Sequence, residues 1–210
     1  MISEKDKGSV RKQFEKLENE VRLSYFTQEH ECKYCEETRE LLEEVSSLSQ
    51  KIKLHVYDFV ADRKKAESYS IDKIPAIVIE GEKDYGIRFF GIPSGYEFSS
   101  LIEDIVDVSR GKTDLSEESK KSLKKINRKV HIQVFVTPTC PYCPSAVRLA
   151  HKLSIESPHI RGEMIEAIEF PHLASKYSVF GVPKTVVNDK VEFEGAVPEK
   201  VFVENVLKAL

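Results

Sequence analysis

The sequence lacks tryptophan altogether and has only two methionines in 210 residues. Asparagine and glutamine are scarce, whereas lysine and glutamate are abundant, a bias typical of thermophile proteins. No stretch approaches the roughly 18 apolar residues of a membrane span. The N-terminal segment has no apolar run that could be the core of a signal peptide. We therefore expect a cytoplasmic protein of a thermophile, with no membrane partner.

An excess of charge of one sign is also missing, because the formal net charge is only −3. Such a balance exerts no general attraction toward nucleic acid or anionic membranes. The most basic segment, residues 109–129, has no interleaved aromatic residues and is interpreted as a solvated helix surface. With 40% hydrophobic and 32% charged residues, the composition is that of a globular protein whose partners do not include nucleic acid.

Cysteine is confined to two Cys-x-x-Cys motifs, Cys-Lys-Tyr-Cys at residues 32–35 and Cys-Pro-Tyr-Cys at residues 140–143. The dipeptides Ile74-Pro75 and Val182-Pro183 follow them, and each proline lies 43 positions after the first cysteine of its motif. In a cytoplasm, paired cysteines more often indicate catalysis or metal binding than static disulfides. The equal framing of the two pairs predicts one dithiol chemistry present twice.

The whole chain repeats with a shift of 108 residues, which predicts two domains, residues 1–108 and 109–210. Each is expected to run strand, helix, strand, short helix, antiparallel strand pair and final helix, an α/β arrangement with a parallel crossover. The predicted first strands are residues 22–26 and 131–136, and the predicted second strands are residues 52–56 and 164–168. The second domain also includes a junction helix, predicted from about Leu115 to Ile126, with Asp114 as N-cap and Glu117 as its reciprocal partner.

The chemistry follows from a strand that ends before each motif and a helix that begins at it. The first cysteine then lies at a helix N-terminus, where unpaired N–H groups and the helix dipole favour thiolate over thiol. We interpret Cys32 and Cys140 as nucleophiles that form a mixed disulfide, and Cys35 and Cys143 as the thiols that resolve it. No cofactor beyond the redox-active disulfides Cys32–Cys35 and Cys140–Cys143 is expected, and no metal.

The two prolines are interpreted as part of a substrate site. If the bonds before Pro75 and Pro183 are cis, the backbones of Ile74 and Val182 turn toward the cysteines. They can then pair with an extended substrate segment, as in strand addition. These four residues are therefore the predicted substrate-binding set.

Each unit resembles a thioredoxin-fold module, and Cys-Pro-Tyr-Cys is typical of glutaredoxins. The tandem arrangement, with PTCPYCP in the second half and EGAVPEK near the C-terminus, is similar to the protein disulfide oxidoreductases of thermophilic prokaryotes. This resemblance implies two tandem thioredoxin-fold units, each with a central mixed four-stranded sheet flanked by helices. It also implies cis prolines, protein disulfides or dithiols as substrates for reduction, oxidation or isomerisation, and a thioredoxin reductase as electron donor.

The chain departs from the related families at two places. The Gly-Gly turn that helps glutaredoxins hold glutathione is missing after Val191, which puts glutathione use in doubt. The buried aspartate of thioredoxins is replaced by Phe26 and Val134. Asp58 and Glu166, which match in the repeat, are candidate proton-transfer acids; the alternative is that both are solvent-facing strand acids.

Three other functions fit parts of the pattern. One is a dedicated electron carrier to a single peroxidase or reductase, which the sequence does not separate from general disulfide exchange. Another is a zinc site, but 104 residues lie between Cys35 and Cys140, whereas paired zinc-binding motifs are usually ~15–20 residues apart. The third is a non-catalytic peptide-binding module, against which the intact cysteines in both units argue.

Overall fold

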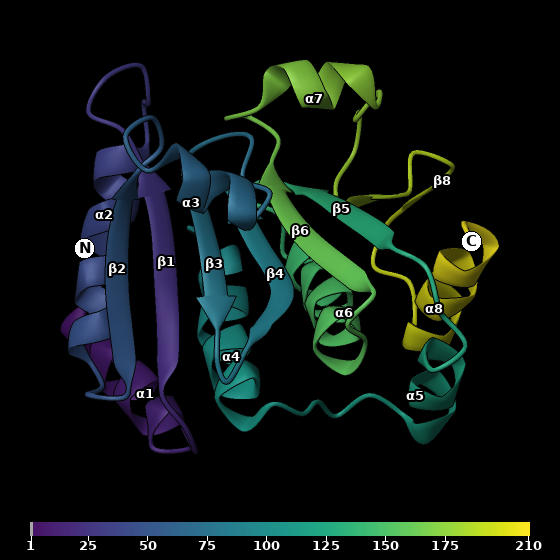
Figure 1. Cartoon of the computed structure of the whole chain (residues 1–210), viewed down its shortest axis with the longest axis horizontal. Coiled ribbons are helices and arrows are strands. Elements are labelled where there is room, and N and C mark those ends of the chain that lie inside the picture. Colours follow the sequence, from purple (N-terminus) through teal and green to yellow (C-terminus); the bar gives the residue numbers. More distant parts are fainter. Residues whose placement is uncertain (1) are drawn as a thin grey trace.

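The computed structural model describes residues 2–210, which form one eight-stranded sheet in the order β2-β1-β3-β4-β6-β5-β7-β8 (Figure 1). The first half of the chain contains α1 (Glu4–Phe14), β1 (Val21–Thr27), α2 (Cys35–Ser47), β2 (Ile52–Asp58), α3 (Arg63–Ser68), β3 (Ala76–Glu80), β4 (Asp84–Phe90) and α4 (Glu97–Arg110). The second half contains α5 (Glu117–Leu123), β5 (Val130–Val136), α6 (Cys143–Glu156), β6 (Ile160–Glu166), α7 (Pro171–Lys176), β7 (Lys184–Val187), β8 (Val191–Glu194) and α8 (Glu199–Lys208).

The two halves repeat one topology. In the first, β1 pairs with β2 in parallel and with β3 antiparallel, and β3 pairs antiparallel with β4. In the second, β5 pairs with β6 in parallel and with β7 antiparallel, and β7 pairs antiparallel with β8. The predicted α/β class with two thioredoxin-like repeats is confirmed, and we call the halves unit 1 and unit 2.

Alternation along the strands separates the hydrophobic core into two layers. In β3, Ile77 and Ile79 face the larger core, with residues of α1, α2, α4, α6 and α8, whereas Ala76 and Val78 face the smaller one, with residues of α3 and α7. Successive strand residues point to opposite faces of a sheet, so a strand that is buried on both faces is apolar throughout. This explains why β3 contains four consecutive apolar residues.

Two sequence expectations were wrong in detail. Strand β6 begins at Ile160 and ends at Glu166, because it pairs with β5 over the full length of both strands; residues 167 and 168 therefore lie beyond the sheet. The junction helix α5 is shorter than predicted, and its N-cap is Ser116, whose side chain accepts a hydrogen bond from the Ser119 amide. Asp114 instead pairs with Lys152 at 2.5 Å.

The units join through a parallel pairing of β4 with β6, in a register from Ile87 opposite Gly162 to Phe90 opposite Ile165. Helix α6 packs closely on this part of the sheet. A Cβ on Gly162 would lie 2.7 Å from the carbonyl oxygen of Ala150, so only glycine fits there. Because β4 and β6 are parallel, their C-terminal ends lie side by side, at the end of the strands where the cysteines also lie.

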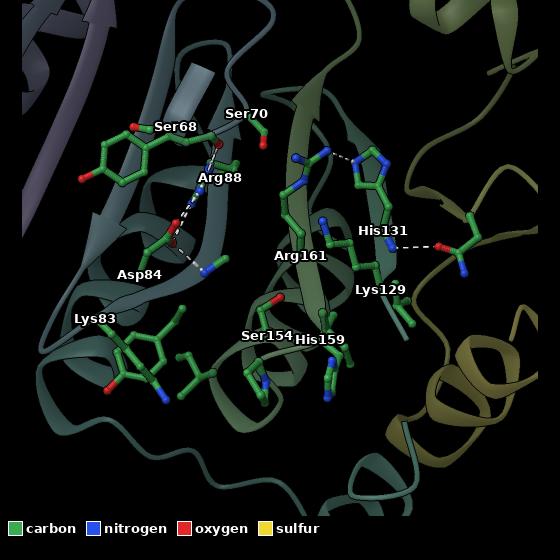
Figure 2. Close-up of a pocket in the computed structure, with 18 residues that line it drawn as sticks. Ser68, Ser70, Lys83, Asp84, Arg88, Lys129, His131, Ser154, His159 and Arg161 are labelled. Atoms are coloured by element: carbon green, nitrogen blue, oxygen red, sulfur yellow. Dashed lines mark hydrogen bonds and ion pairs between the residues drawn. The ribbon is translucent and has the colours of Figure 1, made fainter. Parts of the chain in front are cut away.

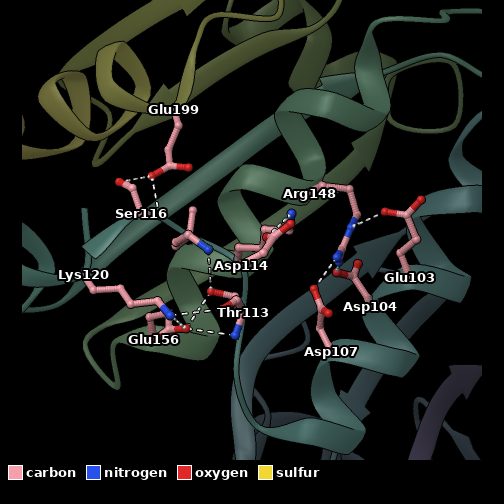
Figure 3. A network of polar contacts seen from close by, with 12 residues as sticks. Glu103, Asp104, Asp107, Thr113, Asp114, Ser116, Lys120, Arg148, Glu156 and Glu199 are labelled. Carbon is pink, nitrogen blue, oxygen red and sulfur yellow. Dashed lines mark hydrogen bonds and ion pairs between the residues drawn. The ribbon is translucent and has the colours of Figure 1, made fainter. Parts of the chain in front are cut away.

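A buried ionic network links α4 of unit 1 to α6 of unit 2 (Figure 3). Arg148 of α6 contacts Glu103, Asp104 and Asp107 of α4, with 3.2 Å between its Nε and the Glu103 Oε2. His151 Nδ1 lies 2.6 Å from the fully buried Asp104 carboxylate. Removal of one partner by substitution would leave a buried charge uncompensated, so such substitutions are expected to destabilise the contact between the two helices.

The connection between the units is held by further polar contacts (Figure 3). The Thr113 amide and hydroxyl both donate to Glu156 Oε1, at 2.9 and 2.6 Å. The Ser116 hydroxyl donates to Glu199 Oε1 of α8 at 2.7 Å.

None of the helices within residues 2–210 is long and apolar enough to cross a membrane.

Candidate active site

A disulfide lies at the turn between the first strand and the following helix of each unit. Cys32 is bonded to Cys35, and Cys140 to Cys143, with 5.5 Å between the Cα atoms in both pairs. The helices begin at the second cysteine rather than at the first, as α2 starts at Cys35 and α6 at Cys143. The first cysteine is still within reach of the helix terminus, because the Cys143 amide donates to Cys140 Sγ at 3.1 Å. An N–H group in this position stabilises a thiolate on Cys140 once the disulfide is reduced.

In each pair the first cysteine is the more accessible one. Cys32 is partly exposed and Cys140 is 8% exposed, whereas Cys35 and Cys143 are 3% and 0% exposed. A substrate sulfur can therefore approach the first cysteine of each pair, while the second lies behind it.

The structure brings the predicted proline residues to the disulfides. The Ile74–Pro75 and Val182–Pro183 bonds are both cis, as expected. The Val182 carbonyl oxygen lies 3.7 Å from Cys140 Sγ. In unit 1, Ile74 and Pro75 line a pocket of about 300 Å³ together with Cys32.

The two candidate acids occupy the last positions of their strands, β2 and β6. Asp58 lines a pocket of about 690 Å³ with Cys32 and Cys35, and its Oδ1 accepts hydrogen bonds from the Val60 and Ala61 amides. Glu166 is only 3% exposed, so the interpretation as a solvent-facing acid is wrong for this residue. Burial raises the pKa of Glu166, and a hydrogen bond from the Glu169 amide partly offsets this rise.

Glu97 is an acid near unit 2 that sequence reasoning missed. It is the first residue of α4 and is 1% exposed, and the amide of the preceding Tyr96 donates to the Pro138 carbonyl in the turn before Cys140. Burial raises the pKa of Glu97 to about 7, although a 2.6 Å hydrogen bond from the Ser100 hydroxyl acts to lower it. The start of α4, where this acid lies, thus contacts the turn that precedes the Cys-x-x-Cys motif of unit 2.

Glu169 is the second acid that was missed, and it lies beside unit 1. It belongs to the loop between β6 and α7 and lines the same pocket as Cys32 and Pro75. Burial raises the pKa of Glu169 to about 7, although a 2.6 Å hydrogen bond from the Ile92 amide acts to lower it. No signal in the sequence could have found it, because its position depends on the pairing of β4 with β6.

Exposed apolar side chains accompany unit 2. Phe180 is 94% exposed two residues before Val182, and Tyr142 within the motif is also exposed. Apolar groups exposed next to a reactive disulfide offer a contact surface for a protein substrate.

A separate pocket of about 420 Å³ opens near the starts of β4, β5 and β6, at the other end of these strands from the cysteines (Figure 2). Its buried charges are paired internally. Arg88 Nη2 lies 2.6 Å from Asp84, and Arg161 and His131 each lie 2.8 Å from the neighbouring buried Glu163. The pocket lies at the seam between the units, that is, at the pairing of β4 with β6, and takes no part in the disulfide sites.

Across the described chain, residues 2–210, no group of three or more His, Cys, Asp or Glu residues is arranged to hold a metal ion.

A model of the thioredoxin domain matches the chain twice, at residues 26–103 and 130–208. The structure of a protein disulfide oxidoreductase from Aeropyrum pernix K1 is 32% identical, with a TM-score of 0.91 over 97% of this chain and 91% of that one. The structure of the alkylhydroperoxide reductase AhpF from Enterococcus faecalis is 28% identical, with a TM-score of 0.91 over 98% of this chain and 99% of that one.

Curated relatives are longer proteins. An NADH dehydrogenase of Bacillus subtilis is 28% identical over 148 residues, and an alkyl hydroperoxide reductase component of Staphylococcus aureus is 28% identical over 152 residues. The matches cover 70% and 72% of this chain but only 27% of each relative. The family is established by the two domain matches and by the Aeropyrum structure. The chain belongs to the thioredoxin-domain family, as a two-unit homologue of the protein disulfide oxidoreductases that carries a redox-active Cys-x-x-Cys disulfide in each unit.

Proposed function

We propose that the chain exchanges disulfides with protein substrates at both of its sites, as reductase, oxidase or isomerase. The observation that carries this proposal is the setting of Cys140. Its sulfur receives the Cys143 amide at 3.1 Å and lies 3.7 Å from the Val182 carbonyl oxygen, in a unit whose second cysteine is fully buried. A sulfur that is more exposed than its resolving partner and is placed to form a stabilised thiolate is the arrangement that thiol–disulfide exchange requires.

The reaction starts when the thiolate of Cys140 attacks one sulfur of a substrate disulfide, and the other substrate sulfur leaves with the electron pair. Cys143 then attacks Cys140 Sγ, which forms the disulfide seen here and releases the second substrate sulfur. Cys32 and Cys35 act in the same way in unit 1. Run in reverse, the steps oxidise a substrate dithiol.

The substrate lies in an extended form along the backbone of Ile74 and Pro75 in unit 1, and of Val182 and Pro183 in unit 2. Support comes from the closeness of the Val182 carbonyl to Cys140 and from the pocket that joins Pro75 to Cys32. An extended segment gains affinity from main-chain hydrogen bonds, so the exchange tolerates many sequences.

Asp58 and Glu166 serve as proton-transfer acids in this proposal, since Asp58 lines a pocket with both unit 1 cysteines and Glu166 is a buried acid at the end of β6. We also take residues 1–108 and 109–210 as the two functional domains, with a thioredoxin reductase as the electron donor.

A second candidate function is that of an electron carrier to one peroxide-reducing partner. It is favoured by the likeness to the alkylhydroperoxide reductase AhpF, which extends over 98% of this chain. Here the same cysteines pass electrons to a single protein disulfide instead of to many.

Insulin reduction with NADPH and a thioredoxin reductase tests the first function. We expect turnover by the wild type, a strong loss in a Cys32→Ser, Cys140→Ser double variant, and activity on several unrelated protein disulfides. Activity on a peroxidase disulfide alone would favour the second function, and no exchange with any disulfide would refute both.

A further inference from the structure

Cys32 lines two pockets, one built by unit 1 alone and one built by both units. Cys32, Tyr34 and Pro75 form one side of the 300 Å³ pocket, and the other side is formed by Ile168, Glu169 and Pro171 of unit 2. These three residues follow β6, whose C-terminal end lies beside that of β4 because the two strands pair in parallel. The fold thus directs the β6–α7 connection, residues 167–170, toward the disulfide of the other unit.

Backbone contacts hold the Glu169 carboxylate in this position. Its Oε1 accepts a hydrogen bond from the Ile92 amide at 2.6 Å, and the adjacent Gly91 amide donates to the Pro75 carbonyl at 2.9 Å. A Cβ on Gly91 would lie 2.8 Å from Glu169 Oε1, so the absence of a side chain there makes room for the carboxylate. The same short backbone segment therefore supports both Pro75 and the acid.

Several charged groups surround Glu169. Burial is the main cause that raises its pKa to about 7, and the nearby carboxylates of Glu166 on β6 and Glu37 on α2 raise it further, against the hydrogen bond from Ile92. Lys33 and Glu31 line the same pocket from the active-site turn. An acid that titrates near neutral pH can both accept and return a proton under working conditions.

The repeat offers no equivalent acid to unit 2. The counterpart of Glu169 under the 108-residue shift is Ala61, and it follows β2, which is an edge strand of the sheet. A loop at that edge is five strands away from β5 and its disulfide. The loop after the second strand therefore supplies an acid in one direction only, from unit 2 to unit 1.

We propose that Glu169, supplied by unit 2, is the group that takes and returns the proton of the Cys32 thiol in unit 1. As Cys32 attacks a substrate disulfide, its thiol proton passes to the Glu169 carboxylate, the new bond forms between Cys32 Sγ and one substrate sulfur, and the substrate disulfide breaks. The other substrate sulfur leaves with the electron pair of the broken bond and takes the proton back from Glu169. The inference rests on the proposed disulfide exchange and names the group that serves it in unit 1.

The test uses a full-length parent protein that keeps only the unit 1 pair, made with Cys140→Ser and Cys143→Ser. In this parent, Glu169→Gln should lower the rate of insulin reduction at pH 7 by at least tenfold, in line with the ~10²–10⁴-fold that general acid–base catalysis usually contributes. The same substitution removes a negative charge near Cys32 and should therefore increase its alkylation by iodoacetamide at pH 7, since alkylation depends on the thiolate alone. Opposite changes in the two rates are the signature of a proton-transfer group, because a distorted site would slow both.

Two controls accompany this variant. Glu82→Gln in the same parent changes an exposed acid in the turn between β3 and β4 and should leave the insulin reduction rate within about twofold. Glu169→Asp restores a carboxylate and should recover part of the lost rate. Equal rates for the parent and Glu169→Gln, or parallel losses in reduction and alkylation, would overturn the proposal while the parent's own turnover upholds disulfide exchange. A parent that reduces no disulfide would overturn the proposed function of unit 1 and this inference with it.

Discussion

The buried carboxyl group of Glu97 predicts that the protein loses stability as the pH rises toward 8. The side chain is 1% exposed, its Oε2 accepts from Ser100, and its Oε1 has no hydrogen-bond partner. Burial raises the pKa of Glu97 from 4.5 to about 7. The folded state therefore binds this proton more tightly than the unfolded state does, and the resulting stability is complete below pH 4.5 and is lost as the pH rises through about 7.

The magnitude follows from the same pKa rise. One pKa unit corresponds to 1.36 kcal/mol, so an increase from 4.5 to about 7 makes a contribution of about 3 kcal/mol to the free energy of unfolding. Glu97→Gln removes the titration but keeps an oxygen that can accept from Ser100. At pH 5 the variant should be less stable than the wild type by about 1 kcal/mol, because the amide introduces a buried donor without a partner. At pH 8 the order should be reversed.

The assay is guanidinium chloride unfolding of the oxidised protein at pH 5 and pH 8, followed by circular dichroism because the chain has no tryptophan. Other buried acids, Glu169 among them, contribute equally to both proteins and cancel in the comparison. The exposed Glu82 provides a matched control, since Glu82→Gln should follow the wild type at both pH values. If Glu97→Gln keeps the full pH dependence of the wild type, the carboxyl group does not titrate in the folded state with a raised pKa.

Three further predictions concern the sulfurs and the seam. Cys143→Ser should accumulate a long-lived mixed disulfide on Cys140, visible by non-reducing electrophoresis and mass spectrometry; a substrate trapped on Cys143 of a Cys140→Ser variant would reverse the assignment of nucleophile and resolving thiol. Arg148→Met should lower the free energy of unfolding at neutral pH by about 3 kcal/mol, because the buried Asp104 and the half-buried Asp107 would remain without their cation; a loss below about 1 kcal/mol in denaturant unfolding would contradict this cost. Two variants that each keep one cysteine pair should differ in reduction potential, both near the ~−180 to −270 mV span of thioredoxin-fold dithiols, because Pro141 fixes the first turn in unit 2 whereas unit 1 has the flexible cation Lys33. Identical potentials in redox titrations would show that these intervening residues do not differentiate the sites.

Local pattern was sufficient for most of the elements. The apolar run that ends at Phe26 predicted β1, which spans Val21–Thr27, and residues 131–136 predicted β5 with an error of one residue. The predicted bounds of β6 lay too far toward the C-terminus, because the apolar pattern continues into Ala167 and Ile168. Only the pairing with β5 shows where the strand ends. The junction helix was misplaced because Asp114 and Ser116 are both good N-cap residues, and the choice depends on the contact of Asp114 with Lys152.

The sequence by itself determined the chemistry of this protein, because that chemistry is local. Two cysteines three positions apart between a strand and a helix lie within bonding distance whatever the rest of the chain does, and the 43-residue frame places Pro75 and Pro183 by repeat symmetry. Only the tertiary structure decided which acids accompany the sulfurs. Glu169 lines a pocket with Cys32 because β4 pairs with β6. This contact joins chain segments more than 70 residues apart, and no pattern in either segment predicts it. The pairing of strand edges depends on the shape and register of two folded halves, and for that reason only the assembled sheet shows that Glu169 of unit 2 lies beside the unit 1 cysteines.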